Sequence, residues 1–327
     1  MKTLQALINR NRKLFFRDRG MLFSSLITPV ILIVLYATFL AKVYKDSFTS
    51  YLPKILHVSE KLIDGAVASQ LGAALLAVSC VTVTFCVNLT MVQDKASGAR
   101  KDFDVSPVKR PVLYLGYFCA TVFNSLMVNV LALVLCLFYI RKMGWYLSAT
   151  DLAWMVLDVL LLVLFGAVLS SIICYPLKTQ GQMSAVGTIV SAGYGFICGA
   201  YMPVSNFGDG LQKFLSYLPG TYGTSLLKNH MLRGVFAQMK EDGFPKQSVT
   251  EIAKSLDCRP MFGGEVVSTQ EMIAVMAASI LILGAVYLVV TAIFYKKEYR
   301  QILGIDKRAD DSVNIDKKWN NLTKIKI

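Results

Sequence analysis

The sequence predicts an all-α integral membrane protein with six transmembrane helices. Hydrophobic residues make up 55% of the 327 residues and charged residues only 17%, whereas about a quarter of an ordinary soluble chain is charged. The mean hydropathy is correspondingly high, at +0.52. Six stretches are also long and apolar enough to cross a hydrocarbon core, which takes about 20 residues of helix. These observations make an ordinary soluble enzyme a poor interpretation.

The six predicted spans follow these apolar stretches in order along the chain. The first contains Pro29, which a transmembrane helix tolerates when neighbouring helices satisfy the freed carbonyl, and it is too long for the apolar region of a secretory signal. The third is longer than needed and should tilt, and the fifth is short and breaks at Gly199 and Pro203. We place the spans at 22–41, 66–92, 112–140, 152–175, 185–202 and 272–295.

The formal net charge of +13 is distributed unevenly between the two sides of these spans. The segments 1–21, 93–111, 176–184 and 296–327 together carry +12, the remaining connections carry +2, and Asp158 lies within a span. Because Lys and Arg gather on the cytoplasmic side, this asymmetry with an even number of spans predicts that both termini are cytoplasmic. Nucleic-acid binding is disfavoured, since the basic residues flank spans and have no domain of their own.

The N-terminal segment 1–21 has the pattern of an amphipathic helix that lies in the membrane interface with its cations snorkelling toward water. The alternative is a charged topology signal with no further role. The apolar face comprises Leu4, Leu7, Ile8, Leu14 and Phe15, and the basic face comprises Arg10, Arg12, Lys13 and Arg17.

The cytoplasmic connection 93–111 mixes both charge signs. It can form one or two helical turns after Asp94, and it ends at Ser106-Pro107, because the residue before a proline is pushed out of helical geometry. A short charged helix at the membrane surface suits docking to a soluble partner. A solvated loop is the alternative.

The stretch 195–222 is too interrupted to span the membrane and too apolar for a free loop. It has the pattern of two half-helices dipping into the outer leaflet, which is allowed only where protein covers the broken backbone. Gly195 and Gly199 are four residues apart, a spacing that lets helices approach closely in membranes. They are candidates for helix packing or dimer contact, with no special role as the alternative.

These three features, in this order, resemble the permease subunit of ATP-binding-cassette exporters of the second type, the ABC type-2 family, over nearly the whole chain. Segment 1–21 looks like that family's elbow helix. Asp94-Lys95-x-x-Gly98 followed by Ser106-Pro107-Val108-x-Arg110 is similar to its coupling helix, at about 93–106, although the family often has glutamate where Asp94 stands. Gly199-x-x-x-Pro203 through Leu218-Pro219-Gly220 resembles its outer re-entrant hairpin before the last span, at about 203–222.

The resemblance implies a six-helix transmembrane domain, 22–295, followed by a basic cytoplasmic tail, 296–327. It also implies that the whole subunit pairs with a second copy of itself or with a paralogue. Each subunit would dock through its coupling helix onto a separate ATP-binding subunit, and the chain itself has no G-x-x-x-x-G-K-[ST] loop. ATP and Mg²⁺ are therefore expected on that partner, and this chain is expected to bind no cofactor and to be no enzyme. The residues expected to couple it to the ATPase are Asp94, Lys95, Gly98, Lys101, Asp102 and Arg110.

Other polar residues offer fewer functional candidates. Asp158 is a candidate contact in the substrate path, because an ionisable group deep in a span costs about 2.5–3.5 kcal/mol; a hydrated structural residue is the alternative. His57 and His230 fall in outside connections, and Cys258 is the one cysteine outside the spans, so no metal-ligand spacing or disulfide framework is present. The outside segment 227–271 is expected to cap the surface, with gating or partner recognition as the alternative.

The predicted function is the permease subunit of an ATP-driven exporter in the bacterial plasma membrane, moving a drug-like, peptide or lipid-like substrate outward. One alternative is a secondary transporter driven by an ion gradient, for which Asp158 alone is thin support. The other is a membrane-embedded enzyme, for which the sequence lacks clustered carboxylates or histidines. Charge reversal at Asp94, Lys101 and Asp102 is expected to uncouple ATP hydrolysis from transport without affecting insertion.

Overall fold

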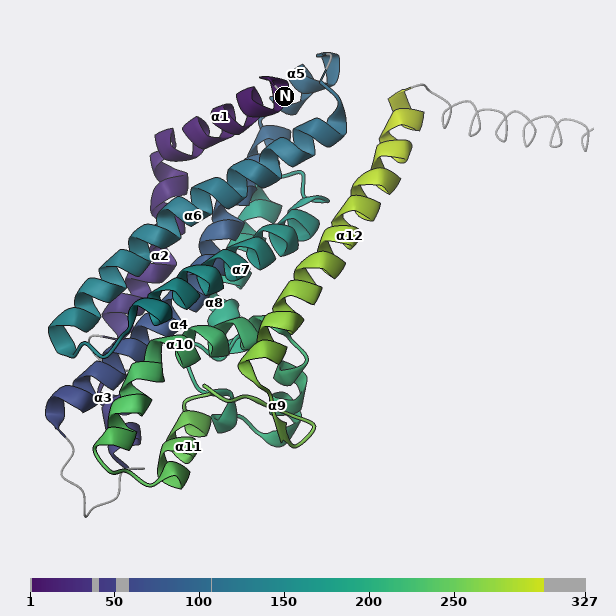
Figure 1. Ribbon diagram of the computed structural model, residues 1–327. Coiled ribbons are helices and arrows are strands. Elements are labelled where there is room, and N and C mark those ends of the chain that lie inside the picture. Colours follow the sequence, from purple (N-terminus) through teal and green to yellow (C-terminus); the bar gives the residue numbers. More distant parts are fainter. Residues whose placement is uncertain (1, 37–40, 51–58, 107, 303–327) are drawn as a thin grey trace, which may run out of the picture. The chain divides into compact units, whose positions relative to one another are not determined.

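The computed structural model describes residues 2–36, 41–50, 59–106 and 108–302, and this part of the chain is almost entirely helical (Figure 1). Its strands are β1 (Met261–Phe262) and β2 (Glu265–Val266), an antiparallel pair with Met261 opposite Val266. The helices are α1 (Lys2–Arg17), α2 (Arg19–Leu35), α3 (Ala41–Ser50), α4 (Glu60–Ala96), α5 (Arg100–Val105), α6 (Arg110–Met143), α7 (Ala149–Cys174), α8 (Gln180–Ile197), η2 (Val204–Asn206), α9 (Asp209–Ser216), α10 (Pro219–Glu241), α11 (Lys246–Ser255) and α12 (Thr269–Ile302).

The chain divides into two compact units, residues 1–283 and residues 284–327. The described part of the second unit is the end of α12, residues 284–302. Residues 303–327, which include most of the predicted basic tail, lie outside the described residues. All features below belong to the first unit unless stated otherwise.

Within the described residues, four helices are long and apolar enough to cross a membrane: α4, α6, α7 and residues 269–293 of α12. They confirm an all-α protein with long apolar helices at four of the six predicted spans. The first predicted span corresponds to α2, a helix of 17 residues, and its end at 37–40 lies outside the described residues. The fifth corresponds to α8, with 18 residues. The six-span count therefore remains a prediction.

Helix α4 forms the centre of the first unit. It has 37 residues, which at helical rise make about 55 Å, and 94% of its most apolar 18 residues are buried. Helices α2, α6, α7, α8 and α10 all pack against it. Small residues on α4 let the neighbouring helices pack close to it. At Gly72, for example, a Cβ atom would already contact Ile140, Cys136 and Met231. Buried small residues are the usual means by which membrane helices approach one another.

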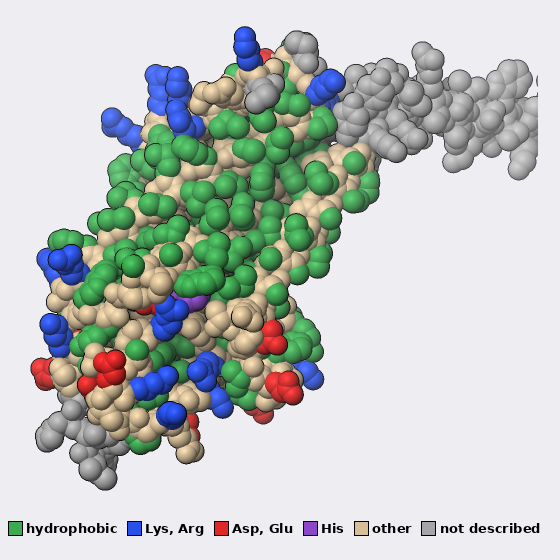
Figure 2. Space-filling model, viewed as in Figure 1, with side chains coloured by type: hydrophobic (Ala, Val, Ile, Leu, Met, Phe, Trp, Pro, Cys, Tyr) green, Lys and Arg blue, Asp and Glu red, His purple; other side chains and the backbone are tan. Residues whose placement is uncertain are grey.

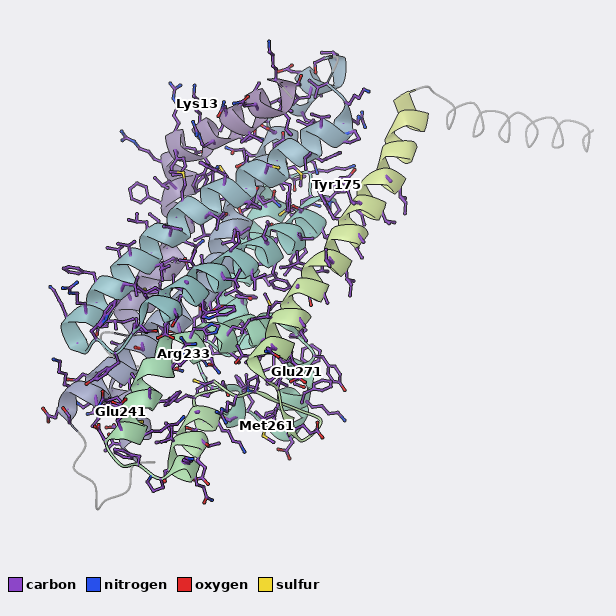
Figure 3. All side chains as sticks on the ribbon, in the orientation of Figure 1. Lys13, Tyr175, Arg233, Glu241, Met261 and Glu271 are labelled. Carbon is purple, nitrogen blue, oxygen red and sulfur yellow. The ribbon has the colours of Figure 1, made fainter. Side chains whose placement is uncertain are left out.

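The surface of the helices changes in character along their length. Figure 2 shows a face that is mostly hydrophobic over α6 and α7, with Lys and Arg gathered at the end formed by α1 and α5. Both charge signs mix at the opposite end, around α10 and α11. Lys13 and Tyr175 mark the first end, and Arg233, Glu241 and Glu271 mark the second (Figure 3). This difference agrees with the charge partition of the sequence, while the side of the membrane that each end faces remains a prediction.

Helix α1 is amphipathic, as predicted. Leu7, Asn11 and Phe15 recur every four residues and are buried, and Phe15 packs with Val83 and Val87 of α4. The helix ends where Asp18 begins α2, its carboxylate accepting a hydrogen bond from the Met21 N–H at 3.1 Å. Such N-capping satisfies a donor that the new helix cannot use itself.

The chain reverses direction after α8. Gly199 adopts φ +71°, and a Cβ atom there would lie 2.7 Å from Val204 Cγ2, so the turn requires glycine both for its left-handed conformation and for its close packing. The chain then forms η2 and α9 and enters α10 at Pro219. Helix α10 continues without a break through 222–227, where the sequence suggests a boundary between the re-entrant hairpin and the outside segment.

Candidate functional site

The connection 93–111 begins at a buried charge cluster between α1, α4 and α6. Asp94 is 5% exposed and accepts two hydrogen bonds from the Arg10 guanidinium, at 2.6 and 2.9 Å. Its Oδ2 also accepts a hydrogen bond from the Tyr117 hydroxyl at 2.5 Å. The hydrogen bond to Asp94 raises the pKa of Arg10 above its ordinary value. Forked Arg–carboxylate pairs are strong and directional, so this cluster ties the N-terminal helix to the end of α4.

The next residue, Lys95, anchors the same point to α7. Its ammonium donates hydrogen bonds to the backbone carbonyls of Tyr175 and, at 3.3 Å, Leu177. It also lies 5.1 Å from the centre of the Tyr175 ring. These carbonyls follow the last turn of α7, where the helix dipole favours a cation. Asp94 and Lys95 therefore face the protein interior and fix the direction in which the chain leaves α4.

Beyond this anchor, the connection turns and presents a short helix. Gly98 adopts φ +85°, a left-handed conformation that glycine provides without strain. On α5, Lys101 and Asp102 are exposed, and Val105 is 89% exposed. Charged and apolar side chains thus lie together on the exposed surface of α5.

The start of α6 completes the connection. The predicted helix end at Ser106-Pro107 is consistent with α5 ending at Val105, although Pro107 itself lies outside the described residues. The Arg100 guanidinium donates a hydrogen bond to the Tyr114 hydroxyl at 2.9 Å. Arg110, the first residue of α6, is partly buried. Of the six predicted coupling residues, Lys101 and Asp102 thus lie on the surface, and Asp94 and Lys95 hold the connection in place.

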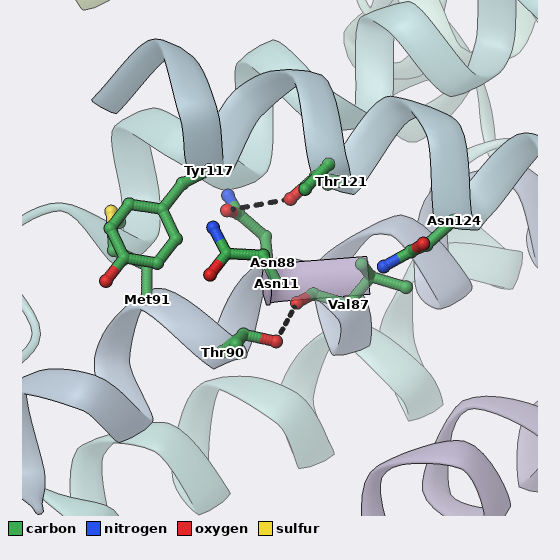
Figure 4. A pocket seen from close by; sticks show the side chains of 9 residues that line it. Asn11, Val87, Asn88, Thr90, Met91, Tyr117, Thr121 and Asn124 are labelled. Atoms are coloured by element: carbon green, nitrogen blue, oxygen red, sulfur yellow. Dashed lines mark hydrogen bonds between the residues drawn. The ribbon is translucent and has the colours of Figure 1, made fainter. Parts of the chain in front are cut away.

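A polar network lies deeper between α4, α6 and α7 (Figure 4). The Asn88 amide donates hydrogen bonds to Ser170 at 3.0 Å and Ser171 at 3.2 Å, and its oxygen accepts one from Thr121 at 3.2 Å. A cavity of about 10 Å³ lies beside it, lined also by Asn11 and Asn124. This volume is about that of a single water site, and Asn11 places α1 beside the network at this cavity.

Asp158, the substrate-path candidate, is paired within the protein. Its Oδ2 lies 2.6 Å from His230 Nδ1 of α10, both side chains are buried, and the Trp154 ring stacks on the imidazole at 5.4 Å. About one turn further along α10, Arg233 forms an ion pair with Asp151 of α7. The two pairs hold α7 against α10. His230, expected in an outside connection, is thus buried beside a residue of a predicted span.

A second buried pair connects α10 to the segment after α11. Lys228 is fully buried; its ammonium lies 3.4 Å from Asp257 Oδ2 and donates a hydrogen bond to the Gly199 carbonyl at 2.9 Å. The same Asp257 oxygen accepts a hydrogen bond from the Val204 N–H at 2.6 Å. Cys258 is buried. In the part of the chain that the structure describes, no three His, Cys, Asp or Glu side chains are grouped so as to hold a metal ion.

The two glycines of the predicted packing pair lie at the chain reversal. The Gly195 carbonyl accepts hydrogen bonds from the Ala200 and Tyr201 N–H groups, and a Cβ atom on Gly195 would overlap the Tyr201 ring. Gly199 follows the end of α8 and forms the turn itself. Both glycines therefore serve the local backbone, and their contact with a second subunit remains a prediction.

Several residues of this arrangement cannot be recognised from sequence alone. Arg10 looks like one of several interface cations, and Tyr117 like an ordinary aromatic of a span, because their partner Asp94 is 84 and 23 residues away. The pairing of Asp158 with His230 likewise joins residues that are 72 positions apart in the sequence. Val105 does carry a signal, since it is an apolar residue within a charged connection.

Comparison with known families finds a match over the part of the chain that contains these features. A family model described as ABC-2 type transporter matches residues 2–232, well over half of the chain. The match includes α1, the connection around α5, and the chain reversal up to the middle of α10. Comparisons with curated proteins and with solved structures gave no significant match.

Proposed function

The chain belongs to the ABC-2 type transporter family as a membrane permease domain, and on that premise we propose that it is the permease subunit of an ATP-driven exporter. It moves a drug-like, peptide or lipid-like substrate out across the bacterial plasma membrane. Permease domains of this family are not catalytic, so a separate ATP-binding subunit supplies ATP hydrolysis and holds ATP and Mg²⁺. Two permeases, identical or related, form the transport unit.

The single observation that carries this proposal is the construction of the 93–106 connection. Asp94 and Lys95 are bonded to α1, α6 and α7 on the inside, while Lys101, Asp102 and Val105 are exposed on α5. A force applied to α5 by a docked subunit therefore acts on an anchor that touches three other helices. This is what a segment needs in order to transmit movement rather than merely connect two spans.

Transport follows if the two states of the ATP-binding subunit favour two packings of the permease helices. A ligand shifts a conformational equilibrium only as far as its affinities for the two states differ. Here the differential contact is between α5 and the partner, and the Arg10–Asp94 pair makes α1 move with it. Helices α2 and α8 complete the six spans, with both termini in the cytoplasm and the bilayer as the surrounding solvent.

Co-purification with a co-expressed ATP-binding-cassette subunit tests the proposal. The surface variant combines Lys101→Glu, Asp102→Lys and Val105→Asp, which leave the Asp94 anchor intact. The matched control is Lys240→Glu with Glu241→Lys, an exposed opposite-charge pair at the other end of the helices. We expect wild type and control to retain the ATPase subunit and its stimulated ATP hydrolysis, and the surface variant to lose both while remaining monodisperse. Normal assembly and transport by the surface variant would show that α5 is not the docking site.

A further inference from the structure

Helix α5 presents different side chains to the surface and to the protein. Lys101, Asp102 and Val105 are exposed. Arg100 and Phe103 are partly buried instead, and their spacing of three residues places both side chains on the same side of a helix. The inward side of α5 therefore includes one cation and one aromatic ring, and the contacts of these two residues join α5 to the rest of the protein.

Phe103 contacts α1 through the Arg10 side chain. The Arg10 Cζ atom lies over the Phe103 ring, 4.9 Å from its centre, which is within the distance of about 6 Å at which a cation is attracted to the face of an aromatic ring. Both terminal nitrogens of the same guanidinium donate hydrogen bonds to Asp94 of α4. A guanidinium forms both kinds of contact at once, because it stacks through its face and donates through its edge. Arg10 is thus the point at which α1, α4 and α5 meet.

Arg100 holds the start of α5 against α6 in a similar way. Its Cζ atom lies 4.9 Å from the centre of the Tyr114 ring, and its guanidinium donates a hydrogen bond to the Tyr114 hydroxyl. Tyr114 packs against Tyr175, with ring centres 5.1 Å apart, and the Tyr175 ring lies beside Lys95. Helix α5 is therefore held at two points, by Arg100 on α6 and by Phe103 on α1.

The turn that leads into α5 gives the helix much less support. The chain reaches α5 from α4 through Gly98, in a left-handed conformation with φ +85°. Apart from its chain neighbours, none of the described residues has an atom within 4 Å of the place where a Cβ atom on Gly98 would stand. Glycine is also the residue with the greatest backbone freedom. The turn can therefore absorb a displacement of α5, whereas the contact of Phe103 with Arg10 passes it directly to α1.

From this arrangement we propose that Phe103 is the positioning residue that passes a displacement of α5 to α1. The proposal rests on the proposed function, in which the ATP-binding subunit moves α5. When that subunit displaces α5, the Phe103 ring displaces Arg10, and α1 moves with Arg10 while the guanidinium stays bonded to Asp94. Phe103 lies on the inward side, away from Lys101 and Asp102. Its loss should therefore leave the ATP-binding subunit bound and remove the response of α1.

Spin labels on the full chain, reconstituted with the ATP-binding subunit, measure this response. Labels at Lys13→Cys on α1 and Lys240→Cys on α10 occupy exposed sites, after Cys119→Ser has removed the one cysteine of the seven that is not buried. Addition of ATP and vanadate should shift the distance between the labels when Phe103 is present. Phe103→Ala should retain the subunit and reduce the ratio of shifted to unshifted molecules about 2- to 5-fold, the effect of one cation–aromatic contact on an equilibrium.

Two further variants separate the aromatic ring from its bulk. Phe103→Tyr keeps a ring and should restore the shift, while Phe103→Leu keeps most of the bulk and should behave like Phe103→Ala. The matched control is Phe138→Ala, which removes an exposed ring of α6 that Lys142 contacts at 5.1 Å and should leave the shift unchanged. A full shift in Phe103→Ala or Phe103→Leu would overturn the proposal. Loss of the ATP-binding subunit from Phe103→Ala would also overturn it, because Phe103 would then belong to the docking surface.

A measurement on the chain alone keeps this proposal distinct from the proposed function. Labels at Lys13→Cys on α1 and Lys101→Cys on α5 should give a narrow distance distribution with Phe103 or Phe103→Tyr, and a broader one with Phe103→Ala. That result in a chain that recruits no ATP-binding subunit supports Phe103 as the residue that positions α5 and refutes the exporter. Recruitment of the subunit with equally wide distributions in all three chains refutes the role of Phe103 and leaves the proposed function standing.

Discussion

The anchor between Arg10 and Asp94 should stabilise the protein measurably, because it joins elements 84 residues apart. Arg10→Ala removes two hydrogen bonds to a carboxylate that is 8% exposed, which then retains Tyr117 as its hydrogen-bond donor. A hydrogen bond to a charged group contributes about 1.5–3 kcal/mol. The Arg10 side chain is itself 32% exposed, so water replaces part of the interaction, and we expect a total loss of about 1–3 kcal/mol.

Detergent-driven unfolding in mixed micelles, followed by circular dichroism, measures this loss as a free energy of unfolding. Asp94→Asn should also destabilise the protein, and the double variant should lose less than the sum of the two, with a coupling energy of at least about 1 kcal/mol. Arg12→Ala is the matched control on the same helix. Its guanidinium lies over the Phe123 ring at 5.6 Å, a contact contributing no more than about 1 kcal/mol at an exposed site. Strict additivity of Arg10→Ala and Asp94→Asn would refute the anchor.

Three further perturbations follow from the structure. Gly199→Ala should cost about 1–2 kcal/mol, because φ there is +71° and Val204 fills the space. Gly193→Ala is the control in the same unfolding assay: it lies inside α8 with open space around it, so it should cost nothing and should stabilise the helix by up to about 1 kcal/mol. His230→Ala should destabilise the protein more than Asp158→Asn, since the loss of His230 leaves the buried Asp158 carboxylate unpaired. If Asp158 lies in the substrate path, Asp158→Asn should also alter transport while the amount of folded protein stays unchanged. Wild-type transport by Asp158→Asn would refute that role. Burial raises the pKa of Asp257 above its usual 3.8 even though Lys228 lowers it, so the folded state binds this proton more tightly than the unfolded state. The free energy of unfolding should therefore fall as the pH rises from 3.8 through the raised pKa, and Asp257→Asn should flatten that dependence; an identical pH profile in the variant would contradict it.

Much of the helical architecture can be predicted from the sequence, because length, hydropathy and the spacing of apolar residues are local properties. The predicted spans 66–92 and 112–140 lie within the long helices α4 and α6, and 152–175 lies within α7 except for its last residue. Helix boundaries that depend on tertiary packing are harder to predict from the sequence. Helix α10 continues from Pro219 to Glu241 because Lys228 and His230 find buried partners, which composition alone does not reveal.

The candidate site, too, is predicted from the sequence only in part. A charged connection at 93–111 is visible in the sequence, and so is its resemblance to a coupling helix. Its six predicted residues look equivalent there, whereas the structure turns Asp94 inward to Arg10 and leaves Lys101 and Asp102 on the surface. A charge reversal at Asp94 would therefore disturb the internal anchor as well as any docking surface.

By itself the sequence determined that this is a helical membrane protein with an uneven charge partition and a short charged connection between two long helices, since these properties belong to single segments. The tertiary structure alone decided which polar groups find partners. Asp94 meets Arg10 and Asp158 meets His230 across 84 and 72 residues, while Tyr194 is left without a partner among the described residues. The physical reason is that a polar group removed from water is satisfied by whatever lies beside it in space, and its neighbours along the chain do not identify that partner.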